Sequence, residues 1–366
     1  LALRKEYEEL QKLIAKLEAI LKDERKLLKV IKDELAEIRE KYADPRRTVI
    51  ESAPQAPIVI EEEKPEAEDT VVLHTKAGFW KRVQPKLLEK TLSGGEALEP
   101  LNHRFDVKTD AKLLVFTDMG MCCQLPVSAI PDGKVKDRGL PLAGLLLGIE
   151  KGETVVGAME APQGDFMGSL FFVTRGGQIK RSAFAEYNVR KARFAAISLK
   201  GEDRLATLWK DAGAESVLLV TRSGMAICFA ASDVPETGRA TSGVRGIALS
   251  PGDQVLSGFP HDGAGEVLLA TDRGCFKRCL LVDFDPQGRG GKGLKAITFQ
   301  KNGANGQALA AAILVTDPKD FEVYLSNGDV AKINSEWVKI ELRSGKGQPF
   351  VVAVLEDVVT DVRSVP

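Results

Sequence analysis

The chain of 366 residues has few of the residue types that build catalytic or metal sites. It has three scattered His, at positions 74, 103 and 261, and an odd number of Cys without a C-x-x-C pair or a His at ligand spacing. This pattern argues against a zinc site, a disulfide framework or histidine catalysis. It favours reduced thiols buried in strands at Cys122, Cys123, Cys228, Cys275 and Cys279.

Long hydrophobic runs are also missing. No apolar stretch approaches the roughly 20 residues that cross a bilayer, and no signal peptide opens the chain. An apolar content of 44% and a charged content of 28% are ordinary for a soluble protein. We therefore expect a cytoplasmic protein without a membrane partner. Because the sequence starts at Leu1 without Met, we expect it to be part of a longer protein.

Positive and negative residues almost balance over the whole chain, but they are unevenly distributed along it. The net charge is −1, which does not indicate a strongly basic nucleic-acid binder. Residues 52–70 contain one Lys and six Asp or Glu, whereas residues 71–366 contain 37 Lys or Arg and 34 Asp or Glu. Any electrostatic function must therefore depend on where the cations lie.

The first 43 residues carry a heptad pattern. Apolar residues occupy positions 3, 7, 10, 14, 17, 21, 28, 31, 35, 38 and 42, with Glu24 at the one interrupted site. This 3-4 spacing predicts an α-helical coiled-coil arm over residues 1–43 that pairs with a partner helix. Asp23 before Glu24 predicts an N-cap, and hence two helices in line or one with a joint. An amphipathic helix packed on its own domain remains the alternative.

A linker follows the predicted arm. Asp44-Pro45 ends the helix, because Pro disfavours helical geometry in the residue before it. The stretch 51–69 is rich in Pro, Glu and Ala. We expect an acidic, extended linker over residues 44–69, with Ile58–Ile60 as a short added strand.

From residue 70 onward the chain repeats one module six times. The repeats read VVLHTKAGFWKRV, LLVFTDMGMCCQL, LFFVTRGGQIKRS, VLLVTRSGMAICF, VLLATDRGCFKRC and FEVYLSNGDVAKI, with aligned glycines at 78, 120, 177, 224, 274 and 328. Each module predicts a β-hairpin whose turn needs a residue tolerant of positive φ. One hairpin cannot bury its own apolar face, so residues 70–366 predict a mainly β, six-bladed, propeller-like disc. An open sandwich is the alternative.

A second, glycine-rich element follows each hairpin. Its copies read SGGEAL, KDRGLPL, KARFAAI, ATSGVRGI, GRGGKGLKAI and RSGKGQPF. The fifth copy overlaps a box-like stretch of Gln287, Gly288, Arg289, Gly290, Gly291, Lys292 and Gly293. This stretch does not fit a Walker phosphate loop, because Pro286 stands where that motif needs Gly and Gly293 where it needs Ser or Thr. We interpret these elements as connections between blade strands.

The heptad arm ending in DPRRTVIE, followed by six modules with Gly/Arg-rich connections, resembles the A subunits of bacterial type IIA DNA topoisomerases. The resemblance covers the whole chain. It implies an arm running back from the dimer gate and a six-bladed β-pinwheel with Greek-key blades, in which neighbouring blades exchange strands. It also implies that the disc binds double-stranded DNA and bends it around the outer rim.

Two branches of this family compete. The gyrase branch has a box of the type Q-R/K-R-G-G-R/K-G in the first module, where this chain has Ser93-Gly94-Gly95-Glu96-Ala97-Leu98 without a cation. A near match lies in the fifth module instead and departs from the box at Gly288. The topoisomerase IV branch is therefore favoured, and a gyrase domain that wraps DNA for negative supercoiling is the alternative.

The resemblance also implies what this chain lacks. The nucleophile of the family is a Tyr preceded by Arg, and the four Tyr here lie in KEYEE, EKYAD, AEYNV and EVYLS. We expect the cleavage domain to lie upstream, so that the chain alone has no catalytic residue, metal or cofactor. ATP and Mg²⁺ would be used elsewhere in the holoenzyme. The implied partners are that cleavage domain, a second A subunit in a homodimer, and the ATPase B subunit. The implied location is the cytoplasm, on the chromosome.

Candidate DNA contacts are cations at repeated positions. Modules one, three and five carry a pair after the turn, at Lys81 and Arg82, Lys180 and Arg181, and Lys277 and Arg278. Connections four to six supply Arg239, Arg245, Arg289, Lys292, Arg343 and Lys346, with Arg138 and Arg193 as weaker candidates. Cations at phosphate spacing predict weak, sequence-tolerant and salt-sensitive binding, to which the glycines add accessible N–H groups.

Two other interpretations of these cations and of the disc stay open. The cations could keep exposed strands soluble and unpaired. The disc could also be a protein-interaction platform or small-ligand binder carried on a coiled coil. Aromatic residues make up 6% of the chain and do not recur at one module position, which gives this second interpretation little support.

Overall fold

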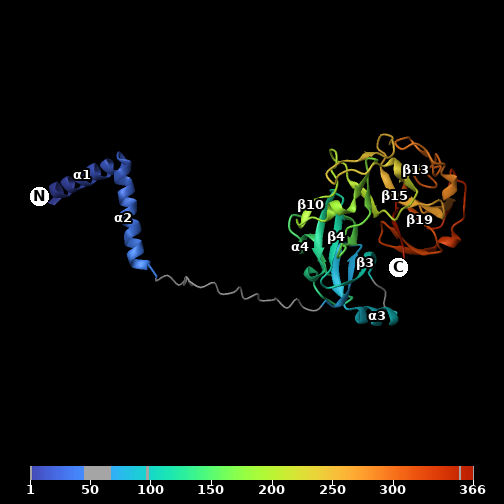
Figure 1. Cartoon of the computed structure of the whole chain (residues 1–366), viewed down its shortest axis with the longest axis horizontal. Coiled ribbons are helices and arrows are strands. Elements are labelled where there is room, and N and C mark those ends of the chain that lie inside the picture. The colour runs from blue at the N-terminus through green and yellow to red at the C-terminus, as the bar shows by residue number, and fades with distance from the viewer. Residues whose placement is uncertain (1, 45–66, 96–98, 354–355, 366) are drawn as a thin grey trace. The chain divides into compact units, whose positions relative to one another are not determined.

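The computed structural model describes residues 2–44, 67–95, 99–353 and 356–365 (Figure 1). It divides into a unit Leu1–Pro65 and a unit Glu66–Pro366, which we describe separately. The proposed strand at Ile58–Ile60 lies outside the described residues, so the predicted extent of the linker stays a prediction. No helix in the described ranges has the length and apolarity needed to cross a membrane.

The first unit contains two helices, α1 (Ala2–Leu21) and α2 (Glu24–Tyr42), which meet at a bend (Figure 1). The Asp23 side chain accepts a hydrogen bond from the Arg25 N–H at 3.0 Å, so the predicted N-cap and joint are confirmed. The apolar heptad residues lie exposed along both helices. This exposure fits a missing partner helix, and the coiled-coil pairing stays a prediction.

The second unit is a disc of six blades, as the repeats predicted, and the blades follow one another from cyan to red in Figure 1. Each blade has a central antiparallel hairpin, and in blades two to five consecutive side chains of its first strand point to the two neighbouring blades. The hairpins are β1 (Asp69–Thr75) with β2 (Phe79–Val83), β4 (Lys112–Thr117) with β5 (Met121–Pro126), β8 (Ser169–Thr174) with β9 (Gln178–Ala183), β12 (Ser216–Thr221) with β13 (Met225–Ala230), β16 (Glu266–Thr271) with β17 (Cys275–Leu280), and β20 (Asp320–Leu325) with β21 (Val330–Asn334).

A third strand pairs with the first strand of each hairpin, and these strands contact one another around the disc axis. They are β3 (Leu101–Lys108), β7 (Val155–Glu160), β11 (Leu205–Lys210), β15 (Val255–His261), β19 (Leu309–Val315) and β23 (Val359–Ser364). The opposite edge of each sheet, formed by the second hairpin strand, therefore lies at the outer rim.

Five blades receive a fourth, outermost strand from the connection of the next module, so the implied strand exchange is confirmed. The exchanged strands are β6 (Leu140–Pro141), β10 (Arg193–Ala195), β14 (Val244–Arg245), β18 (Leu294–Lys295) and β22 (Gln348–Pro349). Each connection includes a short 3-10 turn before its exchanged strand, at Val127–Ala129, Phe184–Tyr187, Ala231–Asp233, Leu281–Asp283 and Ser335–Trp337.

The recurring Thr and Gly form one capped turn in the first, third, fourth and fifth hairpins. Gly224 has a positive φ of 81°, and its N–H donates to the carbonyl of Thr221 at 3.0 Å. The Thr221 hydroxyl in turn accepts from the N–H of Met225 at 3.2 Å. The threonine thus caps the first N–H of the returning strand, which explains its position three residues before the glycine.

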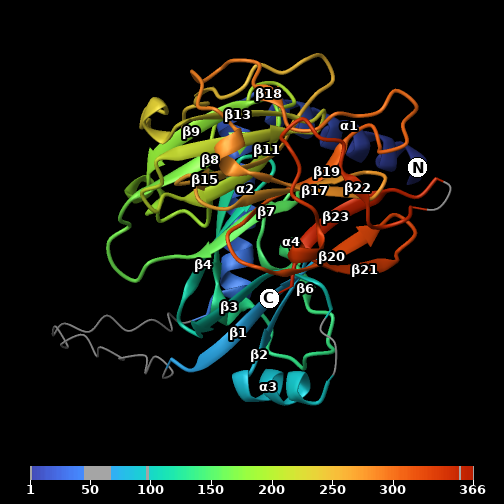
Figure 2. The same ribbon diagram turned by 90° about the vertical axis from the view of Figure 1, so that its right-hand side faces the viewer.

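Apolar clusters join each blade to the next, from the first blade to the sixth. The ends of the disc meet differently: the Lys76 ammonium lies 3.7 Å from Asp361 and 3.0 Å from the centre of the Tyr324 ring. The free apolar face of the first blade packs against Leu88 of helix α3 (Pro85–Ser93). Figure 2 shows α3 at the outer end of the first blade. Within the described residues, the first and last blades thus meet through polar groups.

Four of the five exchanged strands directly follow a glycine. Gly139, Gly243, Gly293 and Gly347 each directly precede an exchanged strand and have a positive φ. A Cβ on Gly293 would lie 2.3 Å from the carbonyl oxygen of Ala226, and one on Gly243 would lie 2.4 Å from that of Ile179. The exchanged strand can therefore reach the neighbouring blade because this residue has no side chain.

Replacing Gly293 should destabilise the exchanged strand that follows it. Gly293→Ala is expected to lower the free energy of unfolding by at least about 1–2 kcal/mol, the cost of a left-handed residue with a Cβ. Gly288→Ala is the matched control, since nothing lies within 4 Å of its added Cβ and its φ is not positive. The control should leave stability unchanged or raise it by up to about 1 kcal/mol. Denaturant unfolding of both variants checks this, and equal losses would contradict the role of Gly293.

Candidate nucleic-acid interface

Three of the predicted DNA-contacting lysines lie in the interior. Lys81, Lys180 and Lys277 are buried in the second hairpin strands of blades one, three and five. The Lys81 ammonium donates to the carbonyls of Val135 and Asp137 at 2.6 and 2.9 Å. The prediction that these lysines face DNA is therefore wrong, because their charges are used to hold the incoming connection of the next blade.

The other two lysines bind the same kind of acceptor. Lys180 donates to the carbonyls of Ala196 and Arg239, and Lys277 donates to those of Leu342 and Arg343 at 3.0 and 2.5 Å. In the second blade, the side-chain amide of Gln124 donates to the carbonyls of Val189 and Lys191. The lysines that recur in modules one, three and five thus have a structural role, because each donates hydrogen bonds to an incoming connection.

Burial lowers the pKa values of two of these buried lysines. It lowers the pKa of Lys180 to about 7, and the nearby Arg239 charge lowers it further while Glu186 acts in the opposite direction. The pKa of Lys277 is also lowered, chiefly by burial. The lowered pKa of Lys180 shows that burying its charge is costly, and the hydrogen bonds that its N–H groups donate to carbonyls offset part of this cost.

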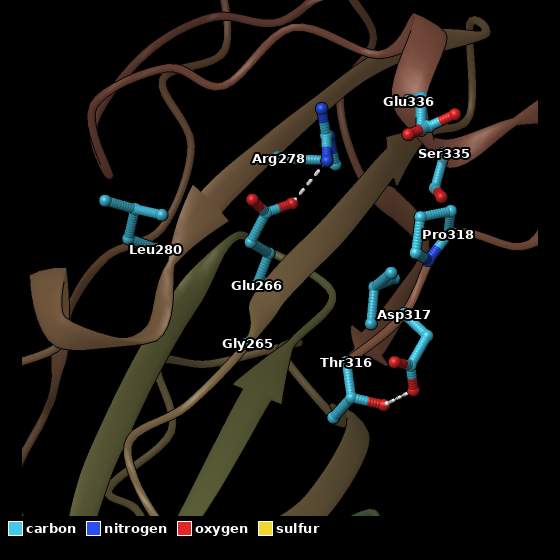
Figure 3. A pocket seen from close by; sticks show the side chains of 10 residues that line it. Gly265, Glu266, Arg278, Leu280, Thr316, Asp317, Pro318, Ser335 and Glu336 are labelled. Atoms are coloured by element: carbon cyan, nitrogen blue, oxygen red, sulfur yellow. Dashed lines mark hydrogen bonds and ion pairs between the residues drawn. The ribbon is translucent and has the colours of Figure 1, made fainter.

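The arginines of the three pairs lie nearer the surface but are neutralised. Arg181 lies 3.1 Å from Asp211, and Arg82 lies 3.9 Å from Asp132. Arg278 donates to Glu266 at 2.6 Å and to the carbonyl of Val338 at 2.7 Å. Figure 3 shows the Arg278–Glu266 pair beside a cavity of about 490 Å³ between blades five and six. These arginines stabilise the blades and are weaker DNA candidates than the sequence suggested.

Three predicted arginines of the connections join one exchanged strand to the next. Arg239, Arg289 and Arg343 donate through their guanidinium groups to the carbonyls of Ala195, Arg245 and Lys295, in that order. All three are half-buried. Because each carbonyl belongs to the preceding exchanged strand, these arginines link the outer strands into a continuous band.

The box-like stretch 287–293 forms part of this band. The N–H of Gln287 donates to the carbonyl of Cys228 at 2.7 Å, and that of Gly290 to Gly246 at 2.8 Å. These two N–H groups are therefore used within the protein, contrary to the expectation of a bare phosphate-binding backbone. Lys292 is exposed in the same stretch and remains a candidate phosphate contact.

Exposed cations nevertheless follow the band from connection two to connection six. Arg245, Lys292 and Lys346 were predicted, and Arg138 was a weaker candidate; all four are exposed. Arg193 is not available, because its guanidinium pairs with Glu153 at 2.9 Å. Aligning the connections on their exchanged strands adds exposed residues that alignment on the turn glycine missed. We call the whole group the rim set: Arg138, Arg190, Lys191, Arg245, Lys292, Lys295 and Lys346.

Other candidate chemistry in the described ranges is structural. All five cysteines are free and buried, as predicted, and burial raises their pKa values. His74 and His103 pair through their Nδ1 atoms at 3.1 Å, and burial lowers their pKa values to about 3 and about 4. Both are therefore neutral near pH 7. Within the described residues, no three metal-ligating side chains gather in one place.

The repeated module of this chain matches a known protein family. The family described as "DNA gyrase C-terminal domain, beta-propeller" matches residues 111–161, 168–208, 215–262 and 265–305. Among solved structures, a C-terminal domain of DNA topoisomerase IV superposes with a TM-score of 0.75 at 25% identity, covering 82% of this chain and 94% of that one. A DNA gyrase A C-terminal domain gives 0.61 at 19% identity, covering 81% and 99%, which shows a shared fold.

Sequence relatives include both branches. The chain is 33% identical over 298 residues to the A subunit of DNA topoisomerase 4 from Bacillus subtilis (strain 168), covering 80% of this chain and 37% of that protein. It is 32% identical over 359 residues to the A subunit of DNA gyrase from Deinococcus deserti, covering 94% and 44%. The chain thus spans less than half the length of these curated relatives.

The Lys180 latch predicts a pH dependence with a definite sign. With a native pKa of about 7 and an ordinary value of 10.5 in the unfolded chain, the unfolded state binds more protons between these pH values. The contribution of Lys180 to the free energy of unfolding therefore rises with pH. Denaturant unfolding of the wild type and of Lys180→Met from pH 6.5 to 9.5 should show the wild type gaining stability relative to the variant.

The surface residue Lys200 supplies the control for this measurement. Lys200→Met should differ from the wild type by an amount that does not change over this pH range. A pH-independent difference for Lys180→Met would show that the buried ammonium keeps an ordinary pKa.

Proposed function

We propose a function for this chain from its family: it belongs to the DNA gyrase and topoisomerase IV A subunits, and residues 66–366 are its C-terminal β-pinwheel domain. On this basis we propose that the rim set binds the phosphates of double-stranded DNA and bends the duplex around the disc. The observation that carries this proposal is the run of exposed cations on successive connections at the outer edge of the blades.

The chemistry of the rim set fits backbone contacts. Lysine and arginine at repeated positions follow the curve of the disc, which suits contacts to the phosphate backbone. Binding driven by phosphate contacts is tolerant of sequence and falls with salt. A net charge of +3 over residues 71–366 keeps the expected affinity low, so the domain would position DNA rather than hold it alone.

We further propose a topoisomerase IV-like role, in which the bent duplex is positioned for strand passage. The first module lacks the cationic box of the gyrase branch, since Ser93, Gly94 and Gly95 end helix α3 and are followed by Glu96 in the sequence. Residues 96–98 of this stretch lie outside the described residues. The higher TM-score to a topoisomerase IV domain supports the same choice. Identities of 33% and 32% do not separate the two branches.

The remaining roles follow from the family and are proposals for the whole protein. We propose that this part of the chain cuts no DNA and hydrolyses no ATP, and that it needs no cofactor of its own. It would act with an upstream cleavage domain and a second A subunit, together with an ATPase B subunit, on the chromosome in the cytoplasm. The relatives are A subunits of type II topoisomerases, which supports this assignment.

Salt titration of DNA affinity tests the phosphate contacts. The double variant Lys292→Ala/Lys346→Ala should bind DNA more weakly and reduce the slope of log affinity against log salt by about two units. The matched control is Lys200→Ala/Lys301→Ala, which removes two exposed lysines from turns that lie outside the exchanged strands. The control should keep the wild-type slope. Equal slopes for all three proteins would overturn the proposal for the rim set.

A further inference from the structure

The sixth blade has an outer edge that the other five blades do not have. Its sheet has three strands in the order β21-β20-β23, whereas the other sheets have four. Val330 of β21 is 46% exposed, but the equivalent Phe276 of the fifth blade is 1% exposed. The side chain of Lys332 is 75% exposed, against 16% for the equivalent Arg278. Among the described residues, no strand lies against the outward edge of β21 (Figure 2).

The five filled blades show what such an edge binds. The donors of blades three, four and five share the pattern Arg-x-x-x-Gly followed by the exchanged strand, in the segments 239–245, 289–295 and 343–349. The glycine lies against a backbone carbonyl of the acceptor strand, and the arginine lies at the 3-10 turn of the acceptor blade. Arg289, for example, donates to the carbonyl of Asp233, and Arg343 to that of Asp283.

In the sixth blade, the residue equivalent to Asp233 and Asp283 is Trp337, which is 66% exposed. It directly follows Ser335 and Glu336, which line the cavity of Figure 3. An exposed Trp beside an open strand edge is typical of a protein-binding surface, because its ring buries a large area at a low entropic cost. The acceptor turn therefore has an aromatic side chain where blades three, four and five have an acid.

The chain itself has no free donor among the described residues. Its three Arg-x-x-x-Gly segments are already bound to blades three, four and five. The nearest equivalent in the first module, Lys90-x-x-x-Gly94, lies in helix α3 and its C-cap. A second copy of the same chain would have the same segments engaged. Every segment of this kind in the described residues is thus engaged, which leaves the edge open to one supplied by a partner protein.

We propose that β21 and Trp337 form a strand-acceptor site that binds an extended Arg-x-x-x-Gly segment of a partner protein. The segment pairs with the outward N–H and C=O groups of Val330 and Lys332, adding the missing fourth strand. Its arginine lies over the Trp337 ring. Its glycine takes a positive φ against the carbonyl of Val330, as Gly293 does against Ala226. This site is separate from the rim set and does not require DNA.

A synthetic peptide tests the site on the full chain. The probe has the sequence of residues 289–295, RGGKGLK, with blocked ends and a fluorescent label, and its binding is followed by anisotropy. Its matched control replaces the glycine equivalent to Gly293 by Ala and keeps the charge. The control should bind about tenfold more weakly, because a side chain disfavours the left-handed conformation. Binding should also shift the Trp337 emission to shorter wavelength. Equal affinity of the two peptides would overturn the proposal.

Two variants at one position separate strand pairing from surface charge. Lys332→Ala keeps the outward N–H and should bind the peptide within about twofold of wild type. Lys332→Pro removes that N–H at an edge where proline is tolerated, and should lose binding. If the proline variant fails to fold, Trp337→Ala, which removes the aromatic ring from the turn, should weaken binding instead. Unchanged affinity in a folded Lys332→Pro or Trp337→Ala variant would contradict the site.

Sedimentation of the chain without peptide separates a partner from a second copy. The chain should show no self-association that Lys332→Pro abolishes. If concentration-dependent dimers form and this variant abolishes them, the edge binds a second copy, and the proposed partner segment is wrong. A result of this kind would leave the salt dependence of DNA binding at the rim set unaffected.

Discussion

The disc depends on one close backbone approach. In four of the five donating connections a glycine lies against a backbone carbonyl of the preceding blade, at a separation that leaves no room for a Cβ at Gly139, Gly243 and Gly293. This approach lets a short strand leave its own module and complete the sheet of its neighbour. The first five blades are therefore each closed by the next one, and the apolar clusters between blades add to a connection already made by the backbone.

Strand exchange also divides the cations into two groups with different roles. Buried lysines such as Lys180 donate to carbonyls of the incoming connection, and half-buried arginines such as Arg289 join successive exchanged strands. The cations that remain exposed lie on the outside of the same connections. The band that closes the blades thus also presents the positive charge, so DNA affinity and disc stability depend on neighbouring residues of the same segments.

Much of the fold could be predicted from the sequence, because each module repeats its own local rules. The Thr and Gly of the hairpin turns and the Asp23 cap act within a few residues, and both were predicted at the right places. Burial of Lys81, Lys180 and Lys277 could not be predicted, since it depends on a connection some 50 to 65 residues away. Alternation along a strand indicates which residues share a face, but it does not show that a neighbouring blade covers that face. The open edge of β21 was missed for the same reason.

Strand exchange separates two groups of lysines: those of the hairpin strands, such as Lys180 and Lys277, are buried under the incoming connection, and those on the connections themselves are exposed. Lysine acetylation of the full chain, quantified by mass spectrometry with and without duplex DNA, tests it most directly. We expect Lys292, Lys295 and Lys346 to react in free protein and to be protected by DNA, and Lys180 and Lys277 to react slowly in both samples. Equal reactivity of the rim lysines with and without DNA would contradict the account, as would fast acetylation of Lys180 in the folded protein.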